Sequence, residues 1–180
     1  MGIFGGSEKM NLKEVTELLK EKGESHRIQS KMAGVKNKME RKSLWIDVKR
    51  DKLEEIVQTL VDNSTEFPHF CVASTSDMGE TVEVIYHFTI NYGKFLEEIQ
   101  INFKVTIPKK DLWIPTLTKI IPGTLFSERE LHEMMGIEIK GLKDTRHLFL
   151  TSDFPKGVYP WRRDETGPKD LNKLYEGWKQ

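Results

Sequence analysis

Two long runs of alternating apolar and polar residues dominate the middle of the chain. In residues 82–92 every second side chain is apolar, and residues 99–107 repeat the pattern after a turn at Gly93. Alternation over this length is typical of antiparallel strands with one buried face and one wetter face. The apolar set expected to line the core is Val82, Val84, Tyr86, Phe88, Ile90, Tyr92, Ile99, Ile101, Phe103, Val105 and Ile107.

Two amphipathic helices come before these strands. Asn11 is placed to cap the first helix, in which Leu12, Val15, Leu18 and Leu19 share one face. Asp51 is placed to cap the second helix, whose apolar stripe runs from Leu53 to Val61. Each stripe offers the sheet an apolar surface to pack against.

Three shorter segments complete the first two thirds of the chain. Residues 25–33 resemble a weak strand, residues 43–49 alternate with strand spacing, and residues 67–75 are apolar and β-like. The resulting order, α-β-β-α-β-β-β, predicts the α+β class. We expect a two-layer sandwich with a mixed or antiparallel sheet and helices on one face.

The last third of the chain is punctuated by prolines. Residues 127–130, Ser-Glu-Arg-Glu, match a capping box, which predicts a helix that begins at Ser127 and ends at Gly136. Pro168 suits the first turn of a last helix, in which Leu171, Leu174, Tyr175 and Trp178 share a face. This face must dock either on the chain's own domain or on a partner. We expect a domain over residues 1–150 and, over residues 151–180, an extended partner-binding tail with a short terminal helix.

Charge and cysteine usage narrow the classes of function. The chain has 180 residues with 28 basic and 28 acidic side chains, a balance that argues against a nucleic-acid footprint over the whole protein. The longest stretches without a charged side chain have ten residues, whereas a membrane-spanning helix needs about 20. The single cysteine, Cys71, excludes an internal disulfide and a self-contained iron–sulfur cluster. These features predict a soluble intracellular protein that carries no obvious metal.

Candidate chemistry is sparse. His69 and Cys71 lie two apart on a predicted strand, but two ligands do not complete a metal site. Glu128 and His132 are one helical turn apart, which would suit half of a metal site or an acid–base pair. We favour a first-turn glutamate stabilised by the helix dipole, with a surface histidine one turn further on. Residues 26–50 hold eight Lys or Arg against two acids, which leaves RNA binding as an alternative.

Spaced motifs in residues 128–164 resemble one known family. Residues 128–137, Glu-Arg-Glu-Leu-His-Glu-Met-Met-Gly-Ile, resemble the E-R-E-V-Y-D-M-F-G-I signature of the complex I 30-kDa-subunit family. Gly141, Asp144 and Arg146 fall where that family has G-H-P-D-L-R-R, and residues 160–164, Pro-Trp-Arg-Arg-Asp, resemble its P-L-R-K-D. Where the chain departs from this pattern, as at Met135 in place of Phe, it resembles the subunits of energy-converting membrane-bound hydrogenases and related sulfur-reducing complexes more than those of respiratory NADH dehydrogenase.

The resemblance implies a cofactor-free accessory subunit in the peripheral arm of a membrane-bound, ion-pumping oxidoreductase. Such a subunit is not catalytic by itself. On the cytoplasmic side of the cell membrane it would brace the large catalytic subunit beside a small iron–sulfur subunit and a ferredoxin-like iron–sulfur subunit, and contact membrane subunits only indirectly. Clusters and catalytic metal are expected in the partners. A subunit of an NADH- or deazaflavin-oxidising, quinone-reducing complex I and a free-standing RNA-binding module are the alternatives.

The same resemblance implies which residues face a partner. They are the charged residues of the motifs: Glu128, Arg129, Glu130, Arg146, Arg162, Arg163 and Asp164. Arginine forks make charge-assisted, bidentate bonds to carboxylates and carbonyls, which suits an interface with the large subunit. The simpler alternative is that Glu130 only caps its helix and that Arg129 is solvated.

Overall fold

A computed structural model describes residues 10–36, 38–94 and 97–168 of the chain. A five-stranded sheet of order β1-β2-β5-β4-β3 lies at its centre. The central pair β2 and β5 is parallel and the other neighbours are antiparallel, so the sheet is mixed. The strands are β1 (Ser25–Ala33), β2 (Met39–Asp47), β3 (His69–Asp77), β4 (Thr81–Ile90) and β5 (Ile99–Pro108).

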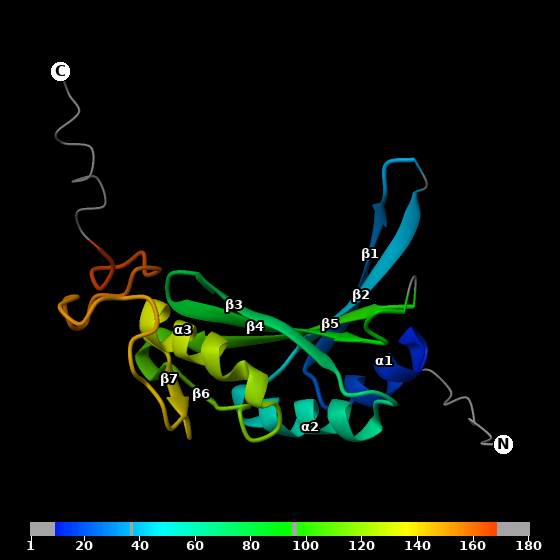
Figure 1. Ribbon diagram of the computed structural model, residues 1–180, viewed down its shortest axis with the longest axis horizontal. Helices are drawn as coiled ribbons and strands as arrows, with labels where there is room; N and C mark the ends of the chain where they lie inside the picture. Colours follow the sequence, from blue (N-terminus) through cyan, green and yellow to red (C-terminus); the bar gives the residue numbers. More distant parts are fainter. Residues whose placement is uncertain (1–9, 37, 95–96, 169–180) are drawn as a thin grey trace.

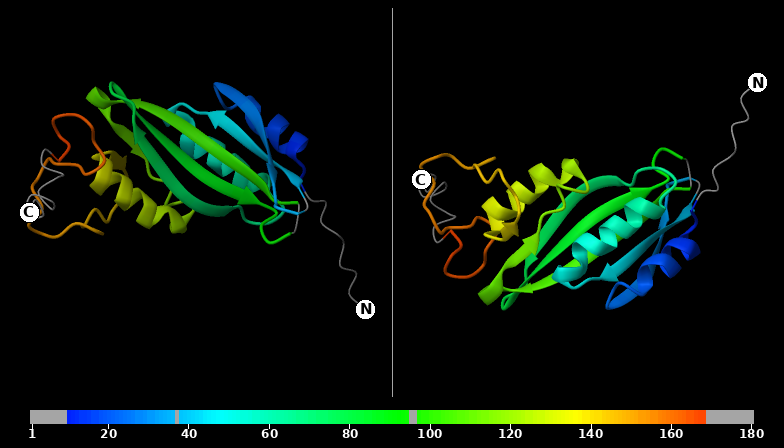
Figure 2. Two further views of the ribbon diagram at one scale, coloured as in Figure 1. Left: turned by 90° about the horizontal axis from the view of Figure 1, so that it is seen from above. Right: turned by 90° about the horizontal axis from the view of Figure 1, so that it is seen from below.

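Two helices cover one face of this sheet and leave the other face open (Figures 1 and 2). They are α1 (Leu12–Lys20) and α2 (Leu53–Asn63). Asn11 caps α1 in a full capping box with Glu14, as expected. The predicted cap at Asp51 is wrong, because Asp51 lies in a 3-10 turn and α2 begins after it without a side-chain cap.

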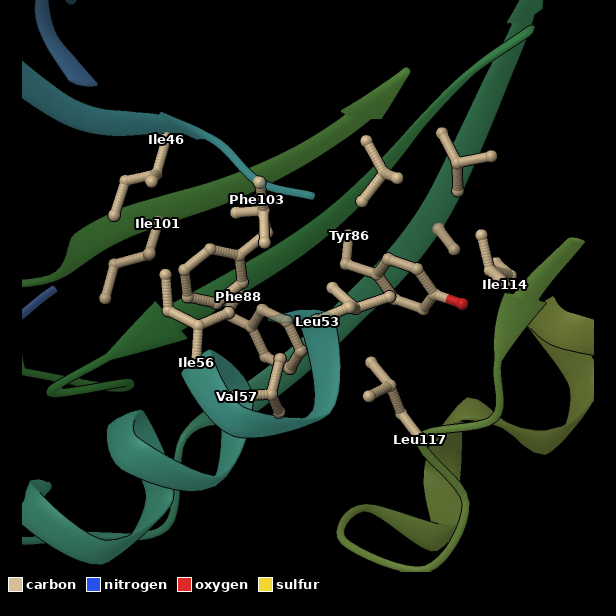
Figure 3. Packing of buried hydrophobic residues seen from close by; sticks show 14 of the residues in the cluster. Ile46, Leu53, Ile56, Val57, Tyr86, Phe88, Ile101, Phe103, Ile114 and Leu117 are labelled. Atoms are coloured by element: carbon tan, nitrogen blue, oxygen red, sulfur yellow. The ribbon is translucent and has the colours of Figure 1, made fainter. Parts of the chain in front are cut away.

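The core lies between the helix-covered face of the sheet and α2 (Figure 3). Leu53, Ile56 and Val57 of α2 pack toward the aromatic side chains of Phe88 and Phe103, all of them buried. The alternating runs therefore form the buried face of β4 and β5 as expected. The α+β sandwich with helices on one face is confirmed.

The alternation ends earlier than the sequence indicates. β4 stops at Ile90, and Asn91 takes a left-handed backbone conformation with φ 55°. This turn moves Tyr92 out of the core, where it was expected, and leaves most of its side chain exposed. The Tyr92 ring stacks instead on His69, with ring centroids 4.1 Å apart.

A second, smaller unit follows the sheet. β6 (Trp113–Pro115) and β7 (Glu138–Lys140) pair in parallel, and α3 (Leu125–Met135) connects them beside β3 (Figure 2). The predicted capping box at Ser127 is wrong, because a 3-10 turn leads directly into α3 and places Ser127 inside the helix. The predicted end at Gly136 is confirmed, in a left-handed conformation with φ 72°.

The chain beyond β7 has no regular secondary structure in its described part, which extends to residue 168. The predicted terminal helix at 171–178 lies outside the described residues. In the part of the chain that the structure describes, no helix is long and apolar enough to cross a membrane.

Candidate partner-binding site

The motif residues lie on α3 and on the loops that surround its C-terminal half. The loops at 144–150 and 157–167 extend past α3 at one end of the molecule (Figures 1 and 2).

Glu128 lies inside the molecule. Its carboxylate accepts hydrogen bonds from Thr116 Oγ1 at 2.5 Å and from the backbone N–H of Leu117 at 2.7 Å, and the residue is fully buried. Burial raises the pKa of the Glu128 carboxyl, and the hydrogen bonds oppose this without cancelling it. Glu128 therefore holds the loop after β6 against α3 by hydrogen bonds.

His132, one turn after Glu128, does not pair with it and lies instead next to a backbone carbonyl. His132 Nδ1 lies 2.9 Å from the carbonyl oxygen of Ile137, just past the end of α3. Glu128 lies in the first turn of α3 as expected, but its carboxylate is buried and hydrogen-bonded, and the histidine expected at the surface is half-buried.

Arg129 holds the loop at 144–150 by its carbonyl groups. Its Nη2 donates to the carbonyl oxygens of Arg146 at 2.8 Å and His147 at 3.0 Å, while Nε donates to Arg146 at 3.2 Å. Asp144 lies 3.5 Å from Nη1. The alternative of a solvated Arg129 is wrong, because only 10% of the side chain is exposed and its guanidinium donates to this loop.

Glu133, one turn further along α3, holds the same loop by its N–H groups. Its carboxylate accepts from the backbone N–H of Leu148, Phe149 and Leu150 at 2.8–3.1 Å and lies 2.9 Å from His147 Nδ1. Burial raises the pKa of Glu133, but these donors outweigh burial and the pKa lies below its ordinary value. Arg129 and Glu133 together leave the loop little freedom.

The loop held by Arg129 and Glu133 exposes Arg146 and Phe149, together with Thr145 and His147. Arg146 is 84% exposed, and its guanidinium forms a fork with the carboxylate of Asp144 at 2.8 and 2.9 Å. Phe149 is 61% exposed although its backbone is held by Glu133. Arginine and aromatic side chains on a rigid backbone are typical of protein interfaces.

The loop at 157–167 is attached to the end of α3. The N–H of Trp161 donates to the carbonyl oxygen of Met134 at 3.0 Å, and Arg162 Nε donates to that of Met135 at 2.7 Å. The Tyr159 ring packs on Gly136 so closely that a Cβ there would lie 2.5 Å from the ring. Glycine is thus required by both the backbone conformation and the contact.

A largely covered lysine joins the second loop to the sheet. Lys109 Nζ lies 2.8 Å from the carboxylate of Asp77 at the end of β3 and 2.5 Å from that of Asp164. The N–H of Arg163 also donates to Asp77, at 2.8 Å. Burial raises the pKa of Asp77, but Lys109 and the backbone donors of Arg163 and Gly79 bring it below its ordinary value. The hydrogen bond from Lys109 and those from Thr166 lower the pKa of Asp164.

Arg162 and Arg163 differ in exposure. The Arg162 guanidinium is nearly buried and lies 3.2 Å from Asp164 and over the Tyr159 ring. Arg163 is exposed, and Trp161, two residues earlier in the chain, is 41% exposed. The loop therefore presents Trp161 and Arg163 and uses Arg162 to hold its own shape.

The predicted partner-binding residues thus divide into two groups. Arg146 and Arg163 are exposed and Glu130 is partly exposed. The others hold loops inside the chain: Glu128, Arg129, Arg162 and Asp164. We call the exposed group at this end of the molecule, Arg146, Phe149, Trp161 and Arg163, the loop surface.

Sequence reasoning missed three residues that hold the site together: Asp77, Lys109 and Glu133. A signal for Glu133 was present, because it lies within the signature segment four residues after Arg129, on the same face of the helix. Asp77 and Lys109 carried no such signal, since 86 residues separate Asp77 from its backbone donor Arg163.

His69 and Cys71, the candidate metal ligands, do not form a site. Cys71 lies in an irregularity of the β3–β4 pairing, with its Sγ 3.4 Å from Thr89 Oγ1, and His69 stacks on Tyr92. Among the residues that the structure describes, no three His, Cys, Asp or Glu side chains come together as ligands for a metal ion.

Comparison with known proteins gives a consistent picture. The profile of the family described as the 30-kDa subunit of respiratory-chain NADH dehydrogenase matches residues 46–170. The chain is 31% identical over 138 residues to the membrane-bound hydrogenase subunit beta of Pyrococcus furiosus, a match that covers 76% of this chain and 79% of that protein. It is 30% identical over 146 residues to the C/D polypeptide of the NADH-quinone oxidoreductase of Erwinia tasmaniensis, of which it spans only 23%.

A solved structure shares the fold. A polypeptide of the membrane-bound sulfane sulfur reductase, an archaeal respiratory membrane complex, superimposes with a TM-score of 0.66 at 22% identity. The superposition covers 93% of this chain and 91% of the other. The two chains therefore share their fold over most of their length.

Proposed function

Because the chain belongs to the family of the 30-kDa subunit of respiratory-chain NADH dehydrogenase, we propose that it is an accessory subunit that braces the large catalytic subunit of a membrane-bound oxidoreductase. The hydrogenase or sulfur-reductase type is favoured by the similarity to a membrane-bound hydrogenase subunit over most of both chains. In this proposal the protein occupies the peripheral arm on the cytoplasmic side of the membrane.

The loop surface is the part of the molecule that supports bracing. Arg129, Glu133 and Lys109 hold two loops by backbone and side-chain bonds, and the loops then expose two arginines and two aromatic residues. A preorganised surface loses little conformational entropy on binding, which favours a tight and permanent contact. The large subunit would cover this surface, and its carboxylates or carbonyls would receive Arg146 and Arg163.

Electron transfer would take place in the neighbours. We expect the chain to bind no cofactor, with clusters in the small and ferredoxin-like iron–sulfur subunits and the catalytic metal in the large subunit. The chain would then fix their relative positions and would contact membrane subunits only through them. Family membership favours this role over the free-standing RNA-binding module.

A second candidate function is a role in an NADH- or deazaflavin-oxidising, quinone-reducing complex I. The identity to the C/D polypeptide of an NADH-quinone oxidoreductase, 30% over 146 residues, supports it. Both candidates use the same loop surface, so the composition of the purified complex separates them.

The test is to tag the chain in its host, solubilise membranes in mild detergent and identify the proteins that co-purify. Co-purified large, iron–sulfur and membrane subunits support the proposal, and nickel in the large subunit would indicate the hydrogenase type. Recovery of the chain alone from the soluble fraction would contradict it.

A matched pair of variants tests the loop surface itself. Phe149→Ser should lower the yield of the large subunit several-fold, whereas Phe67→Ser, which changes an equally exposed phenylalanine before β3, should not. Equal yields from both variants, with both chains folded, would show that the loop surface does not bind the large subunit.

A further inference from the structure

The β1–β2 hairpin extends beyond the sheet without support. β1 pairs with β2 along its whole length, from Ser25↔Asp47 to Ala33↔Met39. β2, however, pairs with β5 only over Ser43–Asp47. The outer part of the hairpin is therefore a two-stranded ribbon that projects away from the helices and the loop surface (Figure 1).

Such a ribbon is poorly stabilised by its own contacts. β1 is an edge strand, and its residues are exposed from Ser25 to Met32. A two-stranded hairpin without a packed apolar face is at best marginally stable in water. We therefore expect another protein surface to cover this ribbon in the functional state of the protein.

Exposed apolar side chains follow one face of the ribbon to its tip. Ile28 is 49% exposed and Met32 56% exposed, and their spacing along β1 places them on the same face. Ile28 pairs across the ribbon with Leu44, which is in the core, so this face continues the core face of the sheet. Val35, in the turn at the tip, is 97% exposed.

The ribbon is also strongly basic in a chain of zero net charge. Residues 25–42 contain six Lys or Arg and a single carboxylate, that of Glu40. Glu40 is already bound, by Lys42 at 3.1 Å and Ser30 at 2.6 Å. Among the described residues, no carboxylate lies within ion-pair distance of Lys31, Lys36 or Lys38. Arg41 has only a long contact, 3.9 Å, to Glu98.

The combination fits an acidic protein surface better than RNA. Recognition of single-stranded RNA relies on aromatic side chains whose faces are free to stack on bases. The aromatic residue of this hairpin, Trp45, is at its base, and the guanidinium of Arg27 lies over its ring at 5.2 Å. Exposed aliphatic side chains on one face of the ribbon, with unpaired cations at its tip and on its other face, instead match a protein interface with an apolar centre and a charged rim.

We propose that the hairpin of residues 25–42 is a second docking arm, which binds an acidic surface of a neighbouring protein in the same complex. Ile28, Met32 and Val35 contact apolar side chains of that neighbour. Lys36 and Lys38 at the tip pair with carboxylates beside them, and Lys31, on the other face of the ribbon, adds to its positive charge. This inference rests on the proposed function. It goes beyond the family match, which begins at residue 46.

Photo-crosslinking within the purified complex tests the arm. Val35→p-benzoylphenylalanine, irradiated in the detergent-solubilised complex, should form an adduct with one neighbouring protein at a segment rich in Asp and Glu. The same substitution at Glu17, exposed on α1, is the control and should give no such adduct. Adducts with RNA, with lipid or with a second copy of this chain, or no adduct at all, would overturn the proposal.

The same experiment separates this inference from the proposed function. Phe149→p-benzoylphenylalanine should crosslink to the large subunit. If it does so while the Val35→p-benzoylphenylalanine variant gives no adduct, the proposed docking arm is wrong and the proposed accessory role is unaffected. If the complex does not co-purify with the chain, the proposed function fails first.

Charge reversal gives a second readout. Lys31→Glu, Lys36→Glu and Lys38→Glu together should weaken retention of the acidic neighbour at least about tenfold at physiological salt, because both rim charges and steering are lost. The matched control reverses three exposed lysines elsewhere, Lys13, Lys110 and Lys119, with the same change in net charge. An equal effect of both triple variants would contradict a specific arm.

Discussion

Arg129 and Glu133, one turn apart on α3, bind complementary backbone groups of the same loop. Arg129 donates to the carbonyl oxygens of Arg146 and His147, and Glu133 accepts from the N–H groups of residues 148–150. A positive and a negative side chain thus replace the backbone partners that a strand or helix would provide. Arg129 and Glu133, two charged residues of the motif, therefore bind a loop of their own chain.

Removing the acceptor should release the loop. Glu133→Gln retains one oxygen but places an amide N–H against the remaining backbone donors, so we expect the free energy of unfolding to fall by about 2–4 kcal/mol. Urea unfolding measures this value. Glu130→Gln is the control on the same helix, because the partly exposed Glu130 receives no hydrogen bond from a described residue, and it should change stability by less than about 0.5 kcal/mol. An equal loss in both variants would contradict the clamp.

The contact between Gly136 and Tyr159 gives a second prediction. Gly136→Ala introduces a Cβ at positive φ and against the Tyr159 ring, and should cost about 1–3 kcal/mol. In a Tyr159→Ala background the clash is absent, so the cost should fall to the backbone strain alone, about 1 kcal/mol. A double-mutant cycle from urea unfolding measures the difference. Additive effects would show that the ring and the glycine are not coupled.

The two neighbouring arginines should differ in what they affect. Arg162→Ala removes a nearly buried guanidinium and leaves Asp164 and the Met135 carbonyl with fewer donors, so stability should fall by about 2–3 kcal/mol. Arg163→Ala removes an exposed side chain and should leave stability within about 0.5 kcal/mol while lowering the yield of the large subunit. Urea unfolding and co-purification, applied to each variant separately, make the distinction. A stability loss on Arg163→Ala with normal assembly would reverse these roles.

The buried Asp77 predicts a specific pH dependence. Its pKa in the folded chain lies below the ordinary value of 3.8, so its contribution to stability is complete above that pH and is lost as the pH falls through the folded pKa. Asp77→Asn should therefore be less stable than the natural protein at pH 7, and the gap should narrow below about pH 4. Urea unfolding between about pH 3 and pH 7 measures the gap. Asp51→Asn, at an exposed position, should be as stable as the natural protein at both ends of this pH range.

Tyr86 leads to a prediction of the opposite sign. Its hydroxyl is buried with no hydrogen-bond partner among the described residues, close to Ile114 and Leu117 (Figure 3). Tyr86→Phe removes an unsatisfied polar group and keeps the ring, so stability should be unchanged or higher by about 1–2 kcal/mol. Thermal and urea unfolding test this, and a loss above about 1 kcal/mol would show that the hydroxyl is bonded in solution.

The sequence by itself determined the sandwich and the family. Alternation in β4 and β5 and the apolar stripes of α1 and α2 predicted the two layers, because burial of one face repeats along a strand or helix with a fixed period. The signature in residues 128–137 located α3 and its end at Gly136. Where local rules failed, as at Asp51 and Ser127, a 3-10 turn had moved the start of the helix.

Only the tertiary structure decided what the motif residues contact. Charge alone suggests the surface, but Glu128, Arg129 and Glu133 lie beneath loops that provide enough donors and acceptors to keep them there. The link from Asp77 through Lys109 to Asp164 joins three distant segments, and no periodicity encodes such a contact. The projection of the hairpin likewise depends on where β2 leaves β5. Sequence patterns report which face of an element is buried; which elements meet, and which charges remain exposed, follows from packing in three dimensions.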